Sequence, residues 1–438
     1  MNNLLLKIIY ILGKKKNIID FINIIYFVIS LFLIGFVSSR LVRDYQFKGE
    51  YYSNLLIASI FLTLTLFLIF FLKKNIRELI IIVITATLVG IYSAEIYIHY
   101  KHFQTFKKVS NSKFETFKDI KNKNSSIAFS GPISNEPFYS MGGLSNSITI
   151  LCNETGKWAL YKSDRYGFNN PDSEWDKNRF DYLIIGDSFA HGGCVDEGKD
   201  ITSHIRELSQ ETAINLGFIG NGPLKNLATL KEYINYLKPK KIYWLHYEGN
   251  DLYNLKQEME NETLVKYLKD NFTLDLINKQ NMIDIGIKKQ IKIYEKYYEE
   301  WNDFTVFKFD KYKFYEILKL SELRKIFGLS AYWNAKVDSN FEIIMEKAKK
   351  EIDFIDADLY FVYLPSYVRF NQLIVKDNFF DKNNLFQVIN KLDIKIIDLE
   401  KLLFNKSTNP LKYFPNRKYG HYTSEAYKKI AEILISFK

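Results

Sequence analysis

Three long apolar segments occupy the first hundred residues of the chain. They run from Phe21 to Val37, from Leu55 to Leu72 and from Leu79 to Ile98, and Glu95 is the one charged residue within them. At 1.5 Å per residue, each is about long enough to cross the roughly 30 Å of hydrocarbon in a bilayer. Buried core helices or a cleaved signal peptide fit less well, because uncharged runs of this length are rare in soluble domains and the first segment lacks a small-residue cleavage site. The pattern therefore predicts a three-helix transmembrane region over residues 1–100.

Strand-like and helix-like segments alternate in the later part of the chain. After a polar, lysine-rich stretch at 101–137, which we expect to be a juxtamembrane stalk, a folded domain is predicted over 138–438. Its strand-like segments are apolar and rich in β-branched and aromatic residues: YLIIG (182–186), AINLGF (213–218), KIYWLHY (241–247), DLYFVYLP (358–365) and IKIIDL (394–399). Helical patterns at 201–210 and 223–238 separate them. This alternation predicts an α/β fold with a parallel sheet and helices on both faces.

One highly charged segment, 255–340, interrupts the alternation. It contains the stretch KKQIKIYEKYYEEWNDF at 288–304. We expect a helical insertion here, which is either a solvated excursion from the sheet or a lid over a functional site.

Charge adds information about location more than about ligands. The 438 residues carry a net charge of +10, but the lysines are scattered and largely matched by acidic residues nearby. No basic stripe with interleaved aromatic residues emerges, so a nucleic-acid partner is not expected. The excess positive charge lies mostly beside the apolar segments, and the cluster Lys14–Lys16 before the first segment favours a cytoplasmic N-terminus. Three crossings of the lipid bilayer would then place the folded domain on the outer face.

A serine follows directly on the first predicted strand of the sheet. The stretch DYLIIGDSFAHGG (181–193) turns from apolar to polar at Gly186, and Ser188 is either a turn residue or a nucleophile. In parallel sheets, chemistry collects at the carboxyl ends of the strands. The next two strands end in NLGFIGNGP (215–223) and HYEGNDL (246–252), which supply glycine N–H groups and the Asn250 amide. His421 precedes the last predicted helix, so a nucleophile, a base and donors for an oxyanion are all present.

These motifs, in this order, resemble those of the SGNH (GDSL-type) hydrolase superfamily. The sequence has Gly-Asp-Ser, then Asn-x-x-x-x-Gly, then Gly-Asn-Asp, then a C-terminal His, and the resemblance covers about 180–438. It implies a flavodoxin-like α/β/α sandwich that hydrolyses or transfers ester-linked acyl groups. It also implies a role for each matching residue: Ser188 as nucleophile, His421 as base, the N–H groups of Ser188 and Gly220 with the Asn250 amide as the oxyanion hole, and Asp187 and Asp251 as supporting residues.

The sequence departs from the family at the acid of the catalytic triad. The family usually places an Asp three residues before the His, and sometimes two, but Lys418 and Tyr419 stand at these positions. The second nitrogen of the His421 ring therefore needs another partner. The candidates are a backbone carbonyl, Asp398, Glu400 and Glu425.

The chain has two cysteines, Cys152 and Cys194, and no Cys-x-x-Cys spacing that would indicate a metal site. The segment 148–172 resembles a "GF-N-x-P" lead-in of membrane-linked SGNH proteins, and we expect it to pack beside the site. In an oxidising compartment the two cysteines could join this lead-in to the loop after Ser188, and otherwise they are two unrelated buried thiols. His191 and Glu197 are expected on the surface of that loop.

The sequence thus leads to one favoured hypothesis and two others. The favoured one is a membrane-anchored serine esterase or O-acyltransferase of a bacterial inner membrane, with its domain on the periplasmic face. It would act on O-acetyl groups of an envelope glycan without a metal or an organic cofactor. The others are a lipid esterase of the same mechanism and a catalytically inactive relative that binds a glycan or assists another membrane protein.

Overall fold

The computed structural model describes residues 18–106, 113–121, 127–129, 140–301, 314–329, 336–371, 381–417 and 420–437. The cluster Lys14–Lys16 and most of the predicted stalk lie outside these residues. The chain divides into two compact units. The first comprises Met1–His102 and Lys313–Trp333, and the second comprises Phe103–Tyr312 and Asn334–Lys438.

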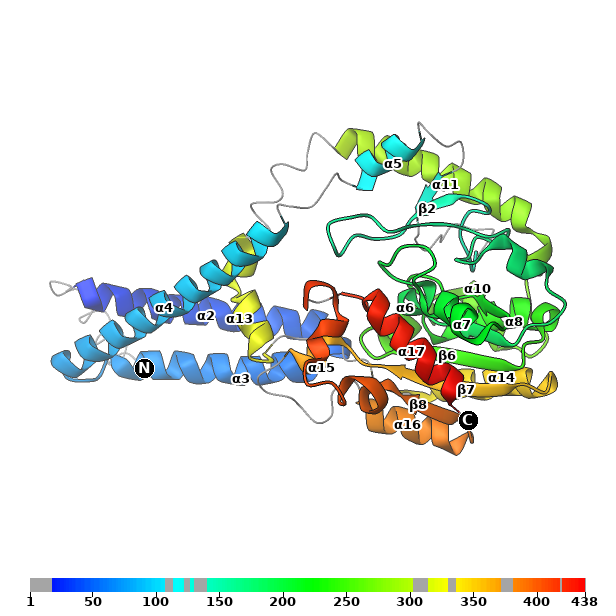
Figure 1. Ribbon diagram of the computed structural model, residues 1–438. Helices are drawn as coiled ribbons and strands as arrows, with labels where there is room; N and C mark the ends of the chain where they lie inside the picture. The colour runs from blue at the N-terminus through cyan, green and yellow to red at the C-terminus, as the bar shows by residue number, and fades with distance from the viewer. Residues whose placement is uncertain are drawn as a thin grey trace. The chain divides into compact units, whose positions relative to one another are not determined.

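Three long helices make up most of the N-terminal unit, as the apolar segments predict (Figure 1). They are α2 (Ile18–Arg43), α3 (Tyr45–Ile69) and α4 (Lys74–Phe106). All three are long and apolar enough to cross a membrane. Large apolar side chains such as Phe32 and Phe61 are more than two thirds exposed, which is the arrangement that a lipid environment favours.

The three helices run up, down and up. Asp20 in the first turn of α2 pairs with Arg77 in the first turn of α4 at 2.8 Å, so these two helices begin at the same end of the bundle. The Tyr26 hydroxyl and Thr85 Oγ1, one turn or more further along, lie 2.9 Å apart. Helix α4 therefore finishes at the end opposite to the start of α2.

Part of the predicted insertion belongs to this N-terminal unit. Glu95, buried in α4, accepts hydrogen bonds from the backbone N–H groups of Glu322 and Leu323 at 2.9 Å each. These are free N–H groups in the first turn of α13 (Ser321–Ile326). His99 Nε2 lies 2.9 Å from the same carboxylate. The one charged residue of the apolar segments thus has donors that satisfy it.

The C-terminal unit is built on a five-stranded sheet, and each strand pairs in parallel with its neighbours, as predicted. The strands are β4 (Tyr182–Ile185), β5 (Ala213–Asn215), β6 (Lys241–Tyr247), β7 (Asp358–Leu364) and β8 (Lys395–Asp398). Their spatial order is β5-β4-β6-β7-β8. The order reverses at β4, which pairs with β5 on one side and with β6 on the other, so the loops after these three strands share one edge of the sheet.

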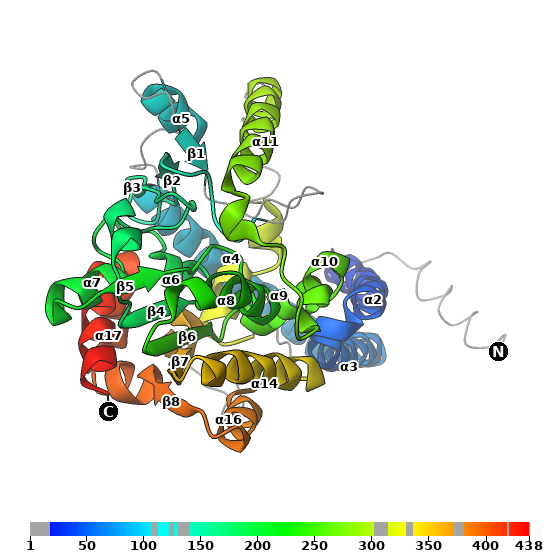
Figure 2. The ribbon, with the colours of Figure 1, turned by 90° about the vertical axis from the view of Figure 1, so that its right-hand side faces the viewer.

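Helices cover both faces of the sheet, because successive strand residues point to opposite sides (Figure 2). Leu183 packs into the core under α8 and α14, whereas Ile184 packs under α7 and α17. Among the residues that the structure describes, the α-helices of this unit are α5 (Lys113–Lys121), α6 (Ser188–His191), α7 (Ile201–Ser209), α8 (Pro223–Leu237), α9 (Asp251–Glu258), α10 (Glu262–Val265), α11 (Gln280–Trp301), α14 (Ser339–Phe354), α15 (Tyr367–Phe370), α16 (Lys382–Lys391) and α17 (Ser424–Ser436).

The first half of the 255–340 segment is not a solvated excursion. Leu264, Tyr267, Ile283 and Ile287 from this segment are buried in the same core cluster as the sheet and α8. The many charged residues of this stretch make its apolar pattern hard to recognise in the sequence. Its apolar residues recur at helical spacing, and they form a face that packs on the sheet domain.

A second, small sheet precedes the large one and carries the lead-in. It consists of β1 (Ile127–Phe129), β2 (Ile148–Ile150) and β3 (Leu160–Lys162), in that order. Strands β2 and β3 form an antiparallel hairpin. The loop of this hairpin, 151–159, contains Cys152 and contributes directly to the site described next.

Candidate active site

A tight turn holds Ser188 at the end of β4. Gly186 has φ +156°, and a Cβ there would lie 2.9 Å from the carbonyl oxygen of Leu245, so the close approach requires glycine. Asp187 caps the short helix α6 by accepting a hydrogen bond from the Phe189 N–H at 2.9 Å. Ser188 is 7% exposed. The turn therefore fixes the serine at the carboxyl edge of the sheet, where the strand order reverses and ligands commonly bind.

His421 lies against this serine. Its Nε2 is 2.8 Å from Ser188 Oγ, although 233 residues separate the two along the chain. The ring packs close to the backbone of Gly193, where a Cβ would lie 2.3 Å from His421 Cδ2. Thr423 caps helix α17 just beyond the histidine by accepting from the Ala426 N–H. The structure thus brings together the serine and the histidine that the motifs suggest as nucleophile and base.

The partner of the second ring nitrogen is Glu154, which the sequence reasoning missed. Glu154 Oε1 lies 2.7 Å from His421 Nδ1, and Oε2 accepts the His421 backbone N–H at 2.8 Å. An ionised carboxylate only accepts hydrogen bonds, so Nδ1 carries the proton and Nε2 is free to accept one from Ser188. Gly420 permits this approach, since a Cβ there would lie 2.5 Å from Glu154 Oε2.

The acids expected from the sequence have other partners. Asp398 and Glu400 both bind Lys382, at 2.8 and 2.7 Å, and Glu425 faces Lys412 at 3.7 Å. Lys418 and Tyr419 lie outside the described residues. The sequence of the lead-in did contain an indication of Glu154, namely its position close to Cys152, which was expected to lie near the loop after Ser188. Glu154 stands two residues after Cys152, and Asn153 closes a tight turn by accepting from the Gly156 N–H at 2.8 Å.

Cys152 and Cys194 form a disulfide across 42 residues of sequence. The bond joins the β2–β3 loop to the loop after Ser188. These two sulfurs and a His421 nitrogen lie within 4.8 Å of one another, and they are the group of metal-ligand atoms found among the described residues. Both sulfurs are engaged in the disulfide, so they are not thiolates that could bind a metal ion.

The lead-in segment packs beside the site, through asparagines. Asn169 Nδ2 donates to the His191 carbonyl at 2.9 Å. Asn170 exchanges two hydrogen bonds of 2.9 Å with the backbone of Asn215, at the end of β5. The Asn215 side chain in turn donates to the Ala190 carbonyl at 2.8 Å. These bonds link the lead-in, the serine turn and the loop after β5.

His191 is buried rather than exposed, contrary to the expectation from sequence, whereas Glu197 is exposed. His191 Nδ1 accepts the Ile219 N–H at 3.2 Å, and Nε2 lies 2.8 Å from the Tyr161 hydroxyl. The ring stacks on Phe218. Burial lowers the pKa of His191 to about 3, so the ring stays neutral. Through its hydrogen bond with the Ile219 N–H, the His191 ring therefore supports the backbone next to Gly220.

The loops after β5 and β6 present the remaining groups named by the motifs. Gly220 has φ +79°, a conformation that favours glycine, and its carbonyl accepts from Asn254 Nδ2 at 3.5 Å. Within the described parts of the chain, the Gly220 N–H has no hydrogen-bond acceptor. Asn250 is the N-cap residue of α9, and its buried Oδ1, an acceptor, has no hydrogen-bond partner among the described residues. These groups lie on loops that flank the serine strand and have unused hydrogen-bonding capacity.

Asp187, in the serine turn, and Asp251, the first residue of α9, are both buried. Burial raises the pKa of Asp187 to about 6. Burial, and next the charge of Asp187, raises the pKa of Asp251 well above its ordinary range. Asp251 accepts the Tyr247 N–H at 3.0 Å. Asp187 Oδ2 is 3.4 Å from Ser188 Oγ, which is longer than the bond to His421. The serine proton therefore faces the histidine.

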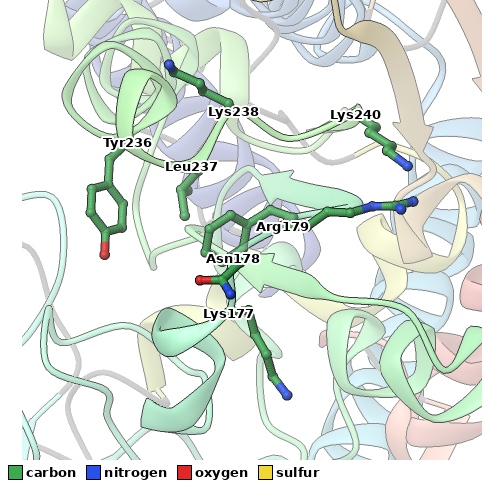
Figure 3. A pocket seen from close by; sticks show the side chains of 8 residues that line it. Lys177, Asn178, Arg179, Tyr236, Leu237, Lys238 and Lys240 are labelled. Carbon is green, nitrogen blue, oxygen red and sulfur yellow. The ribbon is translucent and has the colours of Figure 1, made fainter.

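A hollow of about 390 Å³ lies at the opposite ends of the strands, before β4 and β6. Its lining includes Lys177, Arg179, Lys238 and Lys240. Figure 3 shows the ends of Lys177 and Lys238 pointing in different directions, whereas the ends of Arg179 and Lys240 lie close together on one side. Asp181 also neutralises Arg179 and Lys240, at 2.6 and 3.3 Å. This hollow does not contain the chemistry of the Ser188 site.

No protein-family model and no curated protein matches the sequence of this chain.

Proposed function

We propose that this chain is a membrane-anchored serine esterase or O-acyltransferase of the SGNH (GDSL-type) type. The observation that carries the proposal is the continuous chain of hydrogen bonds from Ser188 Oγ to His421 Nε2, 2.8 Å, and from His421 Nδ1 to Glu154, 2.7 Å. Nucleophile, base and orienting acid in this relation activate a serine for acyl transfer. The strand order supports the family as well, because in the order of the sequence it is 2-1-3-4-5, as in flavodoxin-like sheets.

The geometry leads to a two-step reaction. Ser188 Oγ attacks the carbonyl carbon of an acyl ester while its proton moves to His421 Nε2. The carboxylate of Glu154 stabilises the imidazolium that forms and holds the ring in place. The imidazolium then protonates the leaving alcohol, and an acyl-serine remains. Water, or the hydroxyl of an acceptor, donates its proton to His421 and attacks the carbonyl carbon of the acyl-serine. The bond from this carbon to Ser188 Oγ then breaks, His421 returns the proton to Oγ, and the acid or the new ester leaves.

Three donors would stabilise the negative oxygen of each tetrahedral intermediate. They are the N–H groups of Ser188 and Gly220 and the side-chain amide of Asn250, each on a loop after one of the adjacent strands β4, β5 and β6. Removal of one such donor typically costs about 10²–10³ in kcat. The unpartnered Gly220 N–H supports this assignment, because a preorganised donor must be unoccupied before the substrate arrives.

The substrate class follows from the location. Helices α2–α4 would anchor the chain in the bacterial inner membrane, and their up-down-up course supports an enzyme domain on the side opposite to the N-terminus. A disulfide fits an oxidising compartment such as the periplasm. An envelope glycan that carries O-acetyl groups would be within reach there. A reporter enzyme fused after residue 110 should be active when it requires export, and activity only in the cytoplasm would contradict this orientation.

Glu154 also bears on whether the protein is catalytic. The reason to consider an inactive glycan-binding or assembly partner was the missing acid before His421. Glu154 supplies a carboxylate to the same ring nitrogen from a different segment. The catalytic hypothesis is therefore favoured.

The test is labelling of the purified full-length chain with a fluorophosphonate probe. Wild type should be labelled, and Ser188→Ala and His421→Ala should not. Glu425→Gln serves as a matched control, because it removes an acid four residues from His421 that binds Lys412 instead. A folded wild type that does not react would refute the proposal. Hydrolysis of acetyl esters in preference to long-chain acyl esters would support the glycan over the lipid substrate.

A further inference from the structure

The acid of the site comes from outside the parallel sheet. Glu154 lies on the loop of the β2–β3 hairpin, and the last backbone hydrogen bond of that hairpin runs from the Ala159 N–H to the Cys152 carbonyl at 2.9 Å. Glu154 is therefore two residues beyond the end of the ladder. Three-residue strands give such a hairpin little stability of its own. Some other contact must hold the loop on the catalytic residues.

Polar contacts of described residues connect this loop to the sheet domain. Apart from the bonds of Glu154 to His421, Lys157 pairs with Asp196 at 3.3 Å, and Asn416 Nδ2 donates to the Glu154 carbonyl at 3.3 Å. Both side chains of the ion pair are more than half exposed, and exposed pairs contribute little. The Cys152–Cys194 disulfide is the covalent link, and it begins two residues from Glu154.

The other end of the disulfide belongs to the nucleophile turn. Cys194 follows Gly193, whose N–H donates to the Ser188 carbonyl at 2.8 Å and whose backbone packs on the His421 ring. Cys194 itself has φ +59°, which residues other than glycine rarely adopt. One bond thus connects the segment that carries the acid to the segment that carries the serine and supports the histidine.

We propose that the Cys152–Cys194 disulfide is a positioning element that holds Glu154 on His421, so that the site is competent only in the oxidised chain. This inference rests on the proposed function. Without the disulfide, the hairpin loop is free to leave the histidine. The His421 ring then loses the acceptor, Glu154, that fixes its proton on Nδ1. A displacement of about 1 Å at a catalytic group can cost about 10²-fold in rate.

The switching reaction is a thiol–disulfide exchange with a dithiol reductant. The dithiol gives up two electrons and two protons and becomes a disulfide, and Cys152 and Cys194 each become a thiol. Because the chain contains two cysteines and both are in this bond, such a reductant acts on one position of the protein. Reoxidation should restore the lost activity.

The experiment is a cycle of four measurements on the full-length chain. The rate of fluorophosphonate labelling at Ser188 is measured for wild type and for Glu154→Gln, each in oxidised form and after reduction with dithiothreitol. We expect reduction to slow wild type about 10²-fold and to leave Glu154→Gln nearly unchanged, because the disulfide then has no acid to position. Cys152→Ser/Cys194→Ser should behave as reduced wild type does, without any reductant present.

A second measurement separates positioning from general stability. The acidic limb of the pH–rate profile should move in the same direction in the reduced wild type and in Glu154→Gln, since both lack the carboxylate beside the imidazolium. Loss of folding alone would lower the amplitude without moving the limb.

Two results would overturn the inference while the proposed function stands. One is an oxidised and a reduced wild type that react at the same rate. The other is a Glu154→Gln variant that reduction slows by the same factor as wild type, because the disulfide would then act independently of Glu154. An oxidised, folded wild type that does not label at all would instead refute the proposed function, and this inference with it.

Discussion

Replacement of Glu154 by Gln tests the central contact of the site. The side chain keeps its length, but one carboxylate oxygen becomes an NH₂ group that only donates hydrogen bonds. In the native site both oxygens accept, one from His421 Nδ1 and one from the His421 backbone N–H. Glutamine can satisfy one of these donors at most.

Either orientation of the glutamine damages the base. If the NH₂ group faces Nδ1, the ring must hold its proton on Nε2, and it can no longer accept the Ser188 proton. If the oxygen faces Nδ1, the NH₂ group opposes the backbone N–H and displaces the side chain. A wrong tautomer in a comparable triad costs about 10⁴ in kcat. We therefore expect a loss of about 10³–10⁴, which corresponds to about 4–5.5 kcal/mol of transition-state stabilisation.

The stability of the protein should change far less than its activity. The side chains of Glu154 and His421 are 21% and 18% exposed, so water can replace part of the lost bonding. A net loss of about 1 kcal/mol in the free energy of unfolding is expected for such a hydrogen bond.

The assay is the kcat for an activated acetyl ester, measured with the thermal unfolding midpoint of the same preparation. Glu425→Gln is the matched control and should retain the wild-type kcat. A folded Glu154→Gln variant with kcat within about threefold of wild type would refute the role of Glu154 in orienting His421. A ring in the wrong tautomer should lower kcat by about 10³ or more.

Further substitutions test the surroundings of this contact. Gly193→Ala should lower kcat about 10²-fold, because the new Cβ would lie 2.3 Å from His421 Cδ2 and displace the ring; unchanged kcat would show that the ring does not pack there. His191→Ala should lower kcat by about 10-fold or more, because it removes support from the loop that carries Gly220. His191→Asn can still accept the Ile219 N–H and should therefore recover much of the lost kcat. Equal losses in both variants would indicate a role in packing alone. Burial raises the pKa of Asp164 from an ordinary value of 3.8 to about 6. Between these two pH values the folded state binds a proton that the unfolded state does not bind. The free energy of unfolding should therefore fall as the pH rises from about 4 to about 6. Chemical denaturation of wild type and Asp164→Asn across this window should show that the variant lacks this part of the fall, and identical pH dependence would contradict the assignment.

Much of the architecture could be predicted from local sequence pattern. Uninterrupted apolar runs define α2–α4, because a helix of that length needs no particular neighbours to be recognised. The strands of the large sheet were visible as short apolar runs bounded by turn residues, and parallel pairing followed from the helices between them. Ser188 stood out for the same reason, since a polar residue directly after a buried strand lies at the edge of the sheet whatever the rest of the fold does.

The sequence was less informative where a residue depends on distant partners. The charges of 255–340 suggested a helical insertion, either solvated or a lid, but burial of Tyr267 and Ile283 depends on which face meets the sheet domain. His191 follows a turn and has a polar side chain, which favours the surface. The tertiary structure buries it because the Ile219 N–H and the Tyr161 hydroxyl both need a partner there.

The acid of the site is the clearest case of a feature that only the tertiary structure decided. The order of the motifs along the chain was enough to pair Ser188 with His421, because both lie at places that the sheet topology makes adjacent. Glu154 is 267 residues away from His421 and belongs to a hairpin outside that sheet, so no spacing along the chain relates the two. The disulfide and the absence of side chains at Gly193 and Gly420 bring them into contact. Local sequence thus determined the elements and the strand-end serine, whereas the contact between loops determined which carboxylate orients the histidine.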